Sequence, residues 1–290
     1  MHKFRLGLSH LYMALFLLYL LLPLVVMSGA AFNDSKLPSI VPWKGWTTMW
    51  FSEMIADQRM MIAFRNTLLV AVAVAVLAIV VGTAAAILVN SISGRLRTAL
   101  YGMMISTILI PGVVIGISTM IMWTKLGNAI GTDFILFKPG LHLSVLGQVS
   151  YIAAMVMLLV LARLQSFDAG LEEAALDLGA SHAQVMRRIL LPHLYPAIGA
   201  GAAVAFFQSI ENFNVTQFTR GGADTLTVYV FSKVRSGITP TINALAFLLI
   251  CITLVLAVVY ELNRRRRARA EAARQAQARR AEAEEGIGVV

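Results

Sequence analysis

One carboxylate lies inside a strongly apolar segment of the chain. Glu211 stands about 14 residues past Ala197, so a continuous helix would place it roughly 21 Å from the start of the segment 197–218. An ionisable group in hydrocarbon is costly unless it faces a bundle interior or water. Gln208 and Asn212 share the face of Glu211 at helical spacing. The pattern predicts a translocation path or gate in which the carboxylate is a transient counter-charge for a cation. A buried structural hydrogen-bond site is the alternative.

A proline–glycine pair interrupts a second apolar segment, 100–124. Pro111 has no amide hydrogen, so the carbonyl of Thr107 loses its helical partner. At hydrocarbon depth this is tolerated only where protein or water satisfies the carbonyl. Together with Gly112 and Gly116, Pro111 therefore indicates a helix that lines a cavity, and a kink for close packing is the alternative. Gln148 and Ser150 of the segment 143–162 are weaker path candidates.

The polar segment 163–196 lies between two apolar segments and has a helical pattern. Asp168 is placed to cap a helix that begins near Ala169. Gly179 is placed to end that helix in a left-handed conformation. Ser181 then opens a second helix with a capping box, and the pair Pro192 and Pro196 is expected to close this helix and start the next span.

One face of this second helix is apolar but flanked by polar residues. At helical spacing the face carries Leu178, His182, Val185, Met186 and Ile189. The residues leave two alternatives open: the face packs on the spans of its own chain, or it docks a separate cytosolic subunit.

The same segment carries a long signature that runs Glu173-Ala174-Ala175, three residues, Gly179, nine residues, Ile189, one residue, Leu191-Pro192. It resembles the EAA loop of the permease subunits of binding-protein-dependent ABC importers. In that family the bent pair of helices inserts into a groove on the ATPase subunit. The resemblance implies ATPase-coupling roles for Glu173, Ala174, Ala175, Gly179, Ser181, His182, Ile189 and Pro192.

From about residue 10 to 262 the layout is similar to the second permease of spermidine/putrescine-type importers. The similarity is carried by Trp43-Lys44-Gly45-Trp46-Thr47, by Ile110-Pro111-Gly112-Val113-Val114 and by residues 234–240. Polyamine permeases of this kind often show paired acids where this chain has Glu211-Asn212. The resemblance implies a polyamine-like, amine-containing solute, and other small organic solutes stay open.

Composition sets the class of protein. Of the 290 residues, 58% are hydrophobic and only 13% are charged, and mean hydropathy is +0.76. A soluble domain would carry about 25% charged residues, so a soluble globule is excluded. Six segments are long enough to cross a bilayer: 11–32, 66–90, 100–124, 143–162, 197–218 and 242–262. The first segment is expected to be a retained span, because its run is too long for a signal peptide and lacks a clear cleavage site.

The expected fold is therefore an all-α integral membrane permease of the MetI-like type I importer class, with six helices in residues 1–262. Residues 263–290 form a basic tail that contains eight of the 24 Lys and Arg residues. Arg264 to Arg267, directly after the last span, predict that this end is cytosolic. An even number of spans then places the N-terminus in the cytosol too. The tail itself is expected to be a solvated helical extension or disordered.

The sequence offers no catalytic constellation. It has no G-x-x-x-x-G-K-[ST] loop, no HExxH, no G-x-S-x-G and a single cysteine, Cys251. We expect a non-catalytic subunit without a catalytic residue, metal or cofactor of its own. ATP and Mg²⁺ would be bound by a partner ATPase.

The resemblance implies a multi-pass protein of the bacterial cytoplasmic membrane. Its implied partners are a homologous second permease in a heterodimer, an ATPase dimer, a periplasmic or extracytoplasmic substrate-binding protein and the lipid bilayer, without nucleic acid. Two rival classes are an ion-coupled secondary transporter and a membrane enzyme or assembly factor. A secondary transporter usually has more spans and internal repeats, and an enzyme needs the catalytic groups that are missing here.

Overall fold

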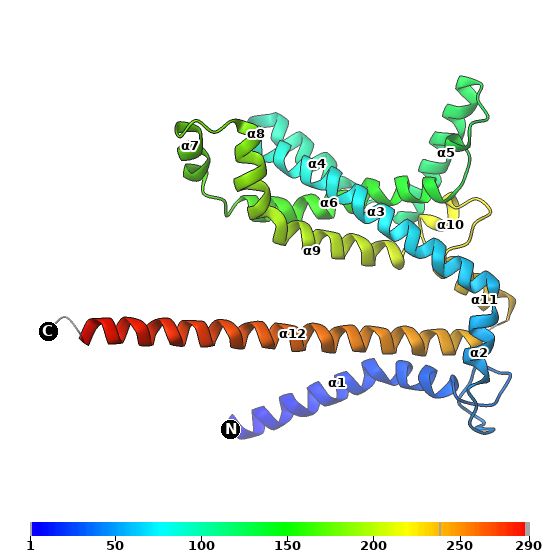
Figure 1. Cartoon of the computed structure of the whole chain (residues 1–290). Coiled ribbons are helices and arrows are strands. Elements are labelled where there is room, and N and C mark those ends of the chain that lie inside the picture. Colours follow the sequence, from blue (N-terminus) through cyan, green and yellow to red (C-terminus); the bar gives the residue numbers. More distant parts are fainter. Residues whose placement is uncertain (1, 238, 288–290) are drawn as a thin grey trace. The chain divides into compact units, whose positions relative to one another are not determined.

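The computed structural model describes residues 2–237 and 239–287. Figure 1 shows the elements in chain order. They are α1 (His2–Ala30), α2 (Met49–Ala56), α3 (Gln58–Ser91), α4 (Gly94–Leu109), α5 (Gly112–Ile130), the 3-10 turn η1 (Ile135–Phe137), α6 (Leu141–Leu164), α7 (Ala169–Asp177), α8 (His182–Val185), the π-helical turn η2 (Met186–Leu190), α9 (Leu191–Ile210), α10 (Thr216–Thr219), α11 (Leu226–Ser236) and α12 (Pro240–Ile287). The described residues contain no strand, only an isolated bridge between Asn33 and Trp46. The expected all-α class is confirmed.

Within the part of the chain that the structure describes, six helices are long and apolar enough to cross a membrane. They are Ser9–Ala30, Gln58–Ser91, Gly112–Ile130, Leu141–Leu164, His182–Ile210 and Pro240–Arg266. The six-span expectation is thereby confirmed. The third expected span is divided as its sequence predicts, because α4 ends at Leu109 and α5 begins at Gly112, after Pro111.

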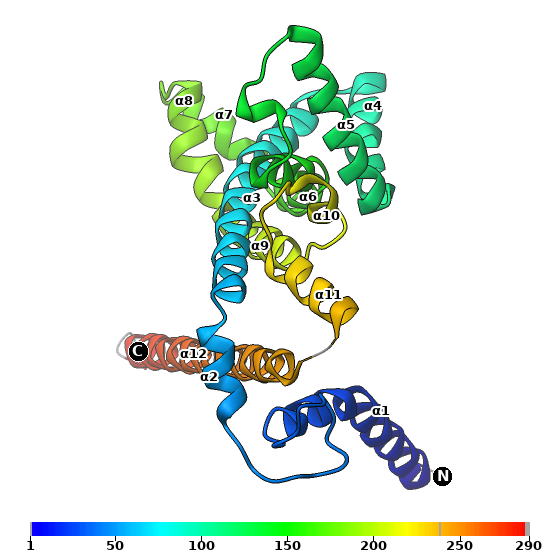
Figure 2. The ribbon, with the colours of Figure 1, turned by 90° about the vertical axis from the view of Figure 1, so that its right-hand side faces the viewer.

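The chain divides into two compact units, which are described separately. The larger unit, Asp57–Ser236, has its core where α3, α6 and α9 pack together. Figure 2 views α6 nearly end-on, with α3 and α9 beside it. The buried centre includes Ile152, Val156 and Met157 of α6, none of which is exposed to solvent. This core holds the ends of α6 and α9, where the candidate site residues lie.

Two glycines allow the close approach of these helices. A Cβ on Gly82 of α3 would lie 2.6 Å from the Ala153 carbonyl oxygen and 2.8 Å from Val156 Cβ. A Cβ on Gly201 of α9 would lie 3.0 Å from Val156 Cγ1. Small residues at such crossings are the usual device of helix packing in membranes.

We expect Gly82→Ala to destabilise the protein by about 1–3 kcal/mol, the usual range for an overpacked core. The added methyl group meets backbone, which cannot swing away. Gly199→Ala in α9 is the matched control, because nothing lies within 4 Å of the added carbon. Thermal unfolding in detergent should show a lower midpoint for Gly82→Ala alone; equal midpoints would contradict the close packing.

The smaller unit contains α1, α2 and α12, with residues 31–48 between α1 and α2. Here α12 contacts both α1 and α2. Rings of Phe32, Phe51 and Phe247 cluster at this contact, with centroid separations between 5.0 and 5.8 Å. The helix α12 continues past the span as far as Ile287, so the part of the tail that the structure describes is helical. The cytosolic location of both termini remains a prediction.

Candidate functional site: the 163–196 elbow and the pocket at the end of α9

The first helix of the elbow begins where its sequence predicts. Asp168 is the N-cap of α7, and its Oδ1 accepts the Gly170 amide at 2.9 Å. This carboxylate satisfies one of the amides that a helix start leaves unpaired. Glu173 and Ala174 are exposed on α7, and Ala175 is half-buried. These three residues are therefore held on a short, well-capped helix.

Gly179 ends α7 in the left-handed conformation, at φ +85°. Its amide donates to the Leu176 carbonyl at 2.9 Å, and the Ala180 amide donates to Ala175 at 3.0 Å. This pair of bonds is the Schellman motif, which satisfies the last carbonyls of the helix. The bend expected at Gly179 is confirmed.

The capping box that opens the second helix is also present. The Ser181 amide donates to Gln184 Oε1 at 2.7 Å, and the Gln184 amide donates to Ser181 Oγ at 3.3 Å. His182 is the first residue of α8 and is exposed. The local chemistry thus fixes both arms of the elbow and the turn between them.

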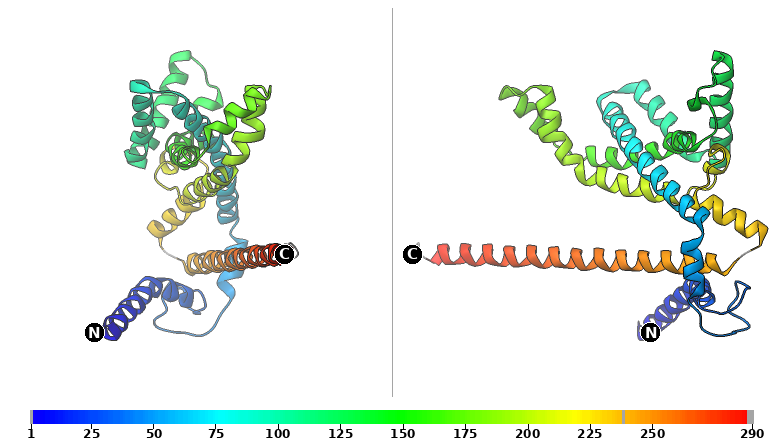
Figure 3. Two further views of the ribbon diagram at one scale, coloured as in Figure 1. Left: turned by 90° about the vertical axis from the view of Figure 1, so that its left-hand side faces the viewer. Right: turned by 45° about the vertical axis from the view of Figure 1, so that its right-hand side comes forward.

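The expected stop at Pro192 and Pro196 is wrong. Residues from His182 to Ile210 form one uninterrupted helical stretch, which bends between α8 and α9 (Figure 3). The bend coincides with η2, where the Leu191 amide donates to the Met186 carbonyl five residues back. The wider π turn makes room for the ring of Pro192, which would otherwise clash with the carbonyl four residues earlier. The helix bends instead of ending.

The apolar face of the elbow is only partly available for docking. Val185 is buried against its own chain, whereas Leu178 is 89% exposed. A hollow of about 300 Å³ lies beside Leu178 and is lined by Leu178, Gly179, Ala180, Gln184, Val185, Arg188 and Ile189. Packing on the chain itself and an exposed apolar surface therefore both occur in this part of the elbow.

The two ends of the 163–196 segment are tied together, which the sequence reasoning missed. Arg163 Nε donates to the His193 carbonyl at 3.2 Å, and His193 Nε2 lies 3.3 Å from the Arg163 carbonyl. The Phe167 ring meets the His193 ring at 5.2 Å. These contacts fix the base of the elbow between α6 and α9.

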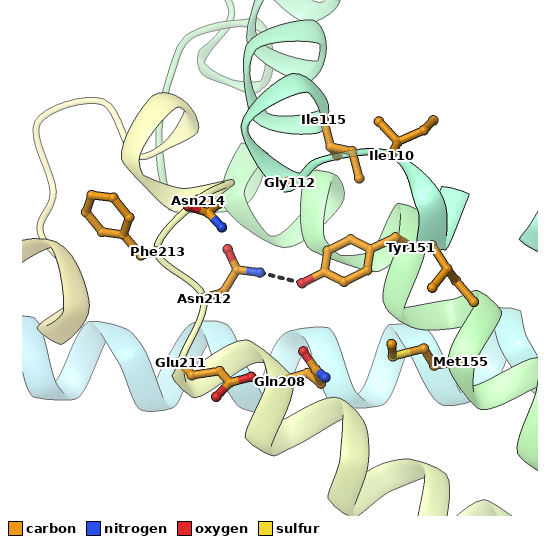
Figure 4. A pocket seen from close by; sticks show the side chains of 11 residues that line it. Ile110, Gly112, Ile115, Tyr151, Met155, Gln208, Glu211, Asn212, Phe213 and Asn214 are labelled. Atoms are coloured by element: carbon orange, nitrogen blue, oxygen red, sulfur yellow. Dashed lines mark hydrogen bonds between the residues drawn. The ribbon is translucent and has the colours of Figure 1, made fainter. Parts of the chain in front are cut away.

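A cavity of about 280 Å³ lies at the other end of α9 (Figure 4). Three elements contribute to its wall: the break between α4 and α5, the middle of α6, and the end of α9 with the loop after it. The lining residues are Ile108, Ile110, Gly112, Ile115, Tyr151, Met155, Gln208, Glu211, Asn212, Phe213 and Asn214. The structure therefore brings Gln208, Glu211 and Asn212 together with the two neighbours of Pro111.

The expected shared helix face is nevertheless wrong. The helix α9 ends at Ile210, Glu211 is its C-cap, and Asn212 lies in the following loop. The side chain of Asn212 replaces the missing helical bonds: its Oδ1 accepts the Val215 amide at 3.1 Å, and its Nδ2 donates to Tyr151 Oη at 2.5 Å. Asn212 is thus chiefly a structural hydrogen-bonding residue, the role that was the alternative for this group.

Glycines of α5 and α6 allow the loop after α9 to pack closely against these two helices. A Cβ on Gly112 would lie 3.0 Å from Asn214 Cβ, and one on Gly116 would lie 2.9 Å from the Val215 carbonyl oxygen. A Cβ on Gly147 of α6 would lie 2.8 Å from Val215 Cγ1. Val215 is fully buried. The region around Pro111 therefore fits both interpretations of its sequence, a helix that lines a cavity and a kink that permits close packing.

Glu211 is exposed, unlike Ile210 before it and Asn212 after it. Among the residues that the structure describes, no hydrogen bond or ion pair of the Glu211 side chain is found. Figure 4 shows Glu211 and Gln208 close to each other at the end of α9, while Asn212 and Tyr151 are joined by their hydrogen bond. The carboxylate is therefore free to meet a cation that enters the pocket. Tyr151 and Asn214 were missed from the sequence, although a tyrosine inside an apolar segment is a detectable signal.

Gln148, a weaker path candidate, makes structural hydrogen bonds within the chain. It is fully buried, donates to Thr216 Oγ1 at 2.9 Å and accepts from Ser209 Oγ at 2.6 Å. These bonds join α6, α9 and α10. Ser150, the other weak candidate, lines an adjacent groove that shares Ile110 and Ile115 with the cavity.

The helix α11 is fastened to the start of α3 through Asp57. Asp57 Oδ1 accepts the Met60 amide at 3.1 Å, Oδ2 accepts the Tyr229 hydroxyl, and Lys233 Nζ lies 3.8 Å away. Burial raises the pKa of the Asp57 carboxyl, but the bonds from Tyr229 and Met60 and the charge of Lys233 outweigh burial, so the net pKa is lowered. This tie holds the segment that follows the pocket loop.

Two charged residues that follow the pocket loop, Arg220 and Asp224, pair with each other at 2.5 Å. The Asp224 carbonyl also accepts Asn66 Nδ2 at 2.9 Å. Their charges are thus largely used within the chain. In the described ranges, no group of three His, Cys, Asp or Glu side chains is placed to hold a metal ion.

Comparisons with known proteins agree on one family. Residues 78–269 match the model of the binding-protein-dependent transport system inner membrane component. The chain is 35% identical to the putrescine transport system permease protein PotI of Escherichia coli (strain K12) over 80% of this chain and 82% of that protein. It is 29% identical to the spermidine/putrescine transport system permease protein PotC of the same strain, over 84% and 89% of the two chains.

The fold matches a solved transporter at lower identity. A bacterial ABC transporter involved in the import of the acidic polysaccharide alginate contains a chain that is 18% identical, with a TM-score of 0.72 over 89% of this chain and 94% of that one. The six apolar helices and these relatives make this a multi-pass protein of the bacterial inner membrane. The chain belongs to the family of inner membrane permease components of binding-protein-dependent ABC importers.

Proposed function

We propose that this permease forms half of the translocation path for a small amine-containing, polyamine-like solute. The observation that carries the proposal is Glu211, an exposed carboxylate without a partner in the described chain, in the wall of a 280 Å³ cavity. Its other polar neighbours are neutral amides and a phenol, so Glu211 supplies the negative charge of the pocket. The relatives named for putrescine and spermidine transport support the same solute class.

A single carboxylate suits passage better than storage. A site that held a diamine at both ends would need two acids, and tight binding would slow release. In this pocket Asn212 follows Glu211, and the Asn212 side chain already forms hydrogen bonds with Tyr151 and the Val215 amide. One ammonium group at a time would therefore meet the carboxylate. The same observation favours a second candidate, a small organic solute with a single amine.

We further propose that the elbow transmits the movement of a partner ATPase to this pocket. The elbow turn at His182 and the pocket residue Gln208 lie on one uninterrupted helical stretch of 29 residues, roughly 43 Å along its axis. A displacement of α8 is then carried to the end of α9, because the Arg163–His193 contacts and the packing on α6 restrain the helix. Glu173, Ala174, Ala175, Gly179, Ser181, His182, Ile189 and Pro192 would form or support the docking surface.

The proposed assembly supplies ATP hydrolysis, the other half of the path and solute delivery through partner proteins. ATP and Mg²⁺ would be bound by the ATPase dimer, and a second, homologous permease would supply the other half of the path in a heterodimer. A periplasmic or extracytoplasmic binding protein would deliver the solute. Alternating access then requires only that α9 and the pocket loop move with the elbow.

Reconstitution tests the solute class. The permease is incorporated in proteoliposomes with its own second permease, ATPase and binding protein, and ATP-dependent uptake of radiolabelled putrescine and spermidine is measured. We expect uptake that unlabelled diamines compete and that neutral sugars do not. The proposal would be contradicted if the transporter took up a solute without an amine group and took up none of the amines.

A further inference from the structure

An aromatic pair in the loop 31–48 lies beside the membrane-spanning part of the smaller unit. Phe247 is about seven positions inside the span Pro240–Arg266, or roughly 10 Å along the helix. The Phe32 ring contacts Phe247 at 5.0 Å and Trp46 at 5.9 Å, and Trp43 meets Trp46 at 5.0 Å. These ring contacts join the span to the two tryptophans, and Phe32 lies two residues past the end of α1 at Ala30, next to the Asn33–Trp46 bridge. The depth of the two tryptophans is therefore that of the membrane boundary.

The loop is folded, so its exposed side chains have fixed positions. Asn33 is fully buried at its centre. The Asn33 Nδ2 donates to the carbonyls of Ser39 at 2.8 Å and Pro42 at 3.0 Å, and its Oδ1 accepts the Lys44 amide at 2.8 Å. The Trp50 indole donates to the Asn33 carbonyl at 2.8 Å. The loop backbone is thereby held by one asparagine.

This fold turns large apolar side chains outwards. Trp46 is 79% exposed and Val41 is 74% exposed, while Leu37 and Trp43 are also exposed. Solvation of such a patch by water is unfavourable, and a patch of this kind marks a membrane or protein contact. Lys36 and Lys44 flank the patch, and Asp34 is the one acid of residues 31–48.

We propose that the loop 31–48 inserts into the headgroup region of the bilayer, with Trp46 and Trp43 at the boundary of the acyl chains. Lipid is the occupant favoured by continuity with α1, which ends at Ala30: in the most apolar window of α1 no residue is buried within the chain. Tryptophan prefers the membrane interface, because its ring is apolar and its N–H needs a polar partner. The two lysines can pair with lipid phosphates at the same level.

Quenching by brominated lipid tests this placement. The assembled transporter, with and without Trp46→Phe, is reconstituted in vesicles of dioleoylphosphatidylcholine or of its dibrominated form. Because both samples contain every other tryptophan, the difference in emission belongs to Trp46. The phenylalanine keeps a ring against Phe32, so the fold of the loop is retained. Iodide in the aqueous phase is the opposing quencher.

We expect brominated lipid to quench the difference emission by about half or more, and iodide to quench it weakly, as for an indole in contact with lipid. Quenching by iodide alone would overturn the proposal, because Trp46 would then face water and be open to a soluble protein. Quenching by neither would overturn it as well, since another chain would cover the ring. The same comparison with Trp43→Phe locates the second member of the pair.

Discussion

Glu211→Gln is expected to lower ATP-driven uptake of an amine solute at least about tenfold, while the transporter still assembles. Glutamine keeps the size of the side chain and removes its charge. The exposed carboxylate makes no bond within the described chain that glutamine would break. A tenfold loss corresponds to about 1.4 kcal/mol, a modest value for removing a counter-charge from a partly dehydrated path.

Two controls separate this effect from a general effect of charge or fold. Asp133→Asn neutralises a carboxylate outside the pocket, whose side chain is 99% exposed and pairs at the surface with Lys138 at 3.1 Å, and should leave uptake unchanged. Asn212→Ala should instead lower thermal stability, because Asn212 holds the pocket loop through Val215 and Tyr151. Uptake by Glu211→Gln equal to that of the unmodified protein would remove Glu211 from the path.

Gly179→Val is expected to abolish stable association of the ATPase with the permease. The φ of +85° is strained for a β-branched residue, with a cost of about 1–2 kcal/mol or more. Nothing lies within 4 Å of an added Cβ, so the effect arises from the backbone and not from a clash. The two arms of the elbow would then lose their angle and α7 its C-terminal cap, although the N-caps at Asp168 and Ser181 are kept.

Gly179→Asn is the matched control, because asparagine tolerates the left-handed conformation better than valine does. Co-purification of the ATPase and its solute-stimulated hydrolysis are compared for both variants. We expect association to be lost with valine and largely retained with asparagine. Intact co-purification of Gly179→Val would show that the bend is not required for docking.

The elbow could be predicted because its determinants are local. Asp168, Gly179 and the Ser181–Gln184 box each act on amides or carbonyls within a few residues. Such short-range bonds leave a signature in the sequence whatever the rest of the fold does. The six spans were predictable for a similar reason, because a membrane demands long apolar helices.

The end of α9 could not be predicted in this way. A helical pattern runs on past Glu211, yet the chain leaves the helix there because Asn212 takes over the Val215 amide and Val215 fits against Gly116 and Gly147. The two glycines are distant from Val215 in sequence, and their spacing shows no periodicity that points to Val215. Tertiary packing therefore overrides local helix propensity at this position.

The helix end predicted at Pro192 is wrong for the opposite reason. Proline is a strong local signal for a helix end, but the π turn at Met186–Leu190 absorbs its ring and the helix continues. The elbow and the pocket thereby lie on one helix, whereas a stop at Pro192 would have separated them. This continuity links ATPase docking to the solute path in the proposed mechanism.

A photo-crosslinking amino acid at position 182 tests the central claim most directly. His182 is exposed at the start of α8, and the crosslinker is placed there in the transporter assembled with its own ATPase. We predict that illumination yields a covalent adduct with the ATPase from position 182. None is expected from position 133, which follows the third span and therefore lies on the outer side if the N-terminus is cytosolic, as predicted. An adduct from position 133, or no ATPase adduct from position 182, would contradict the account.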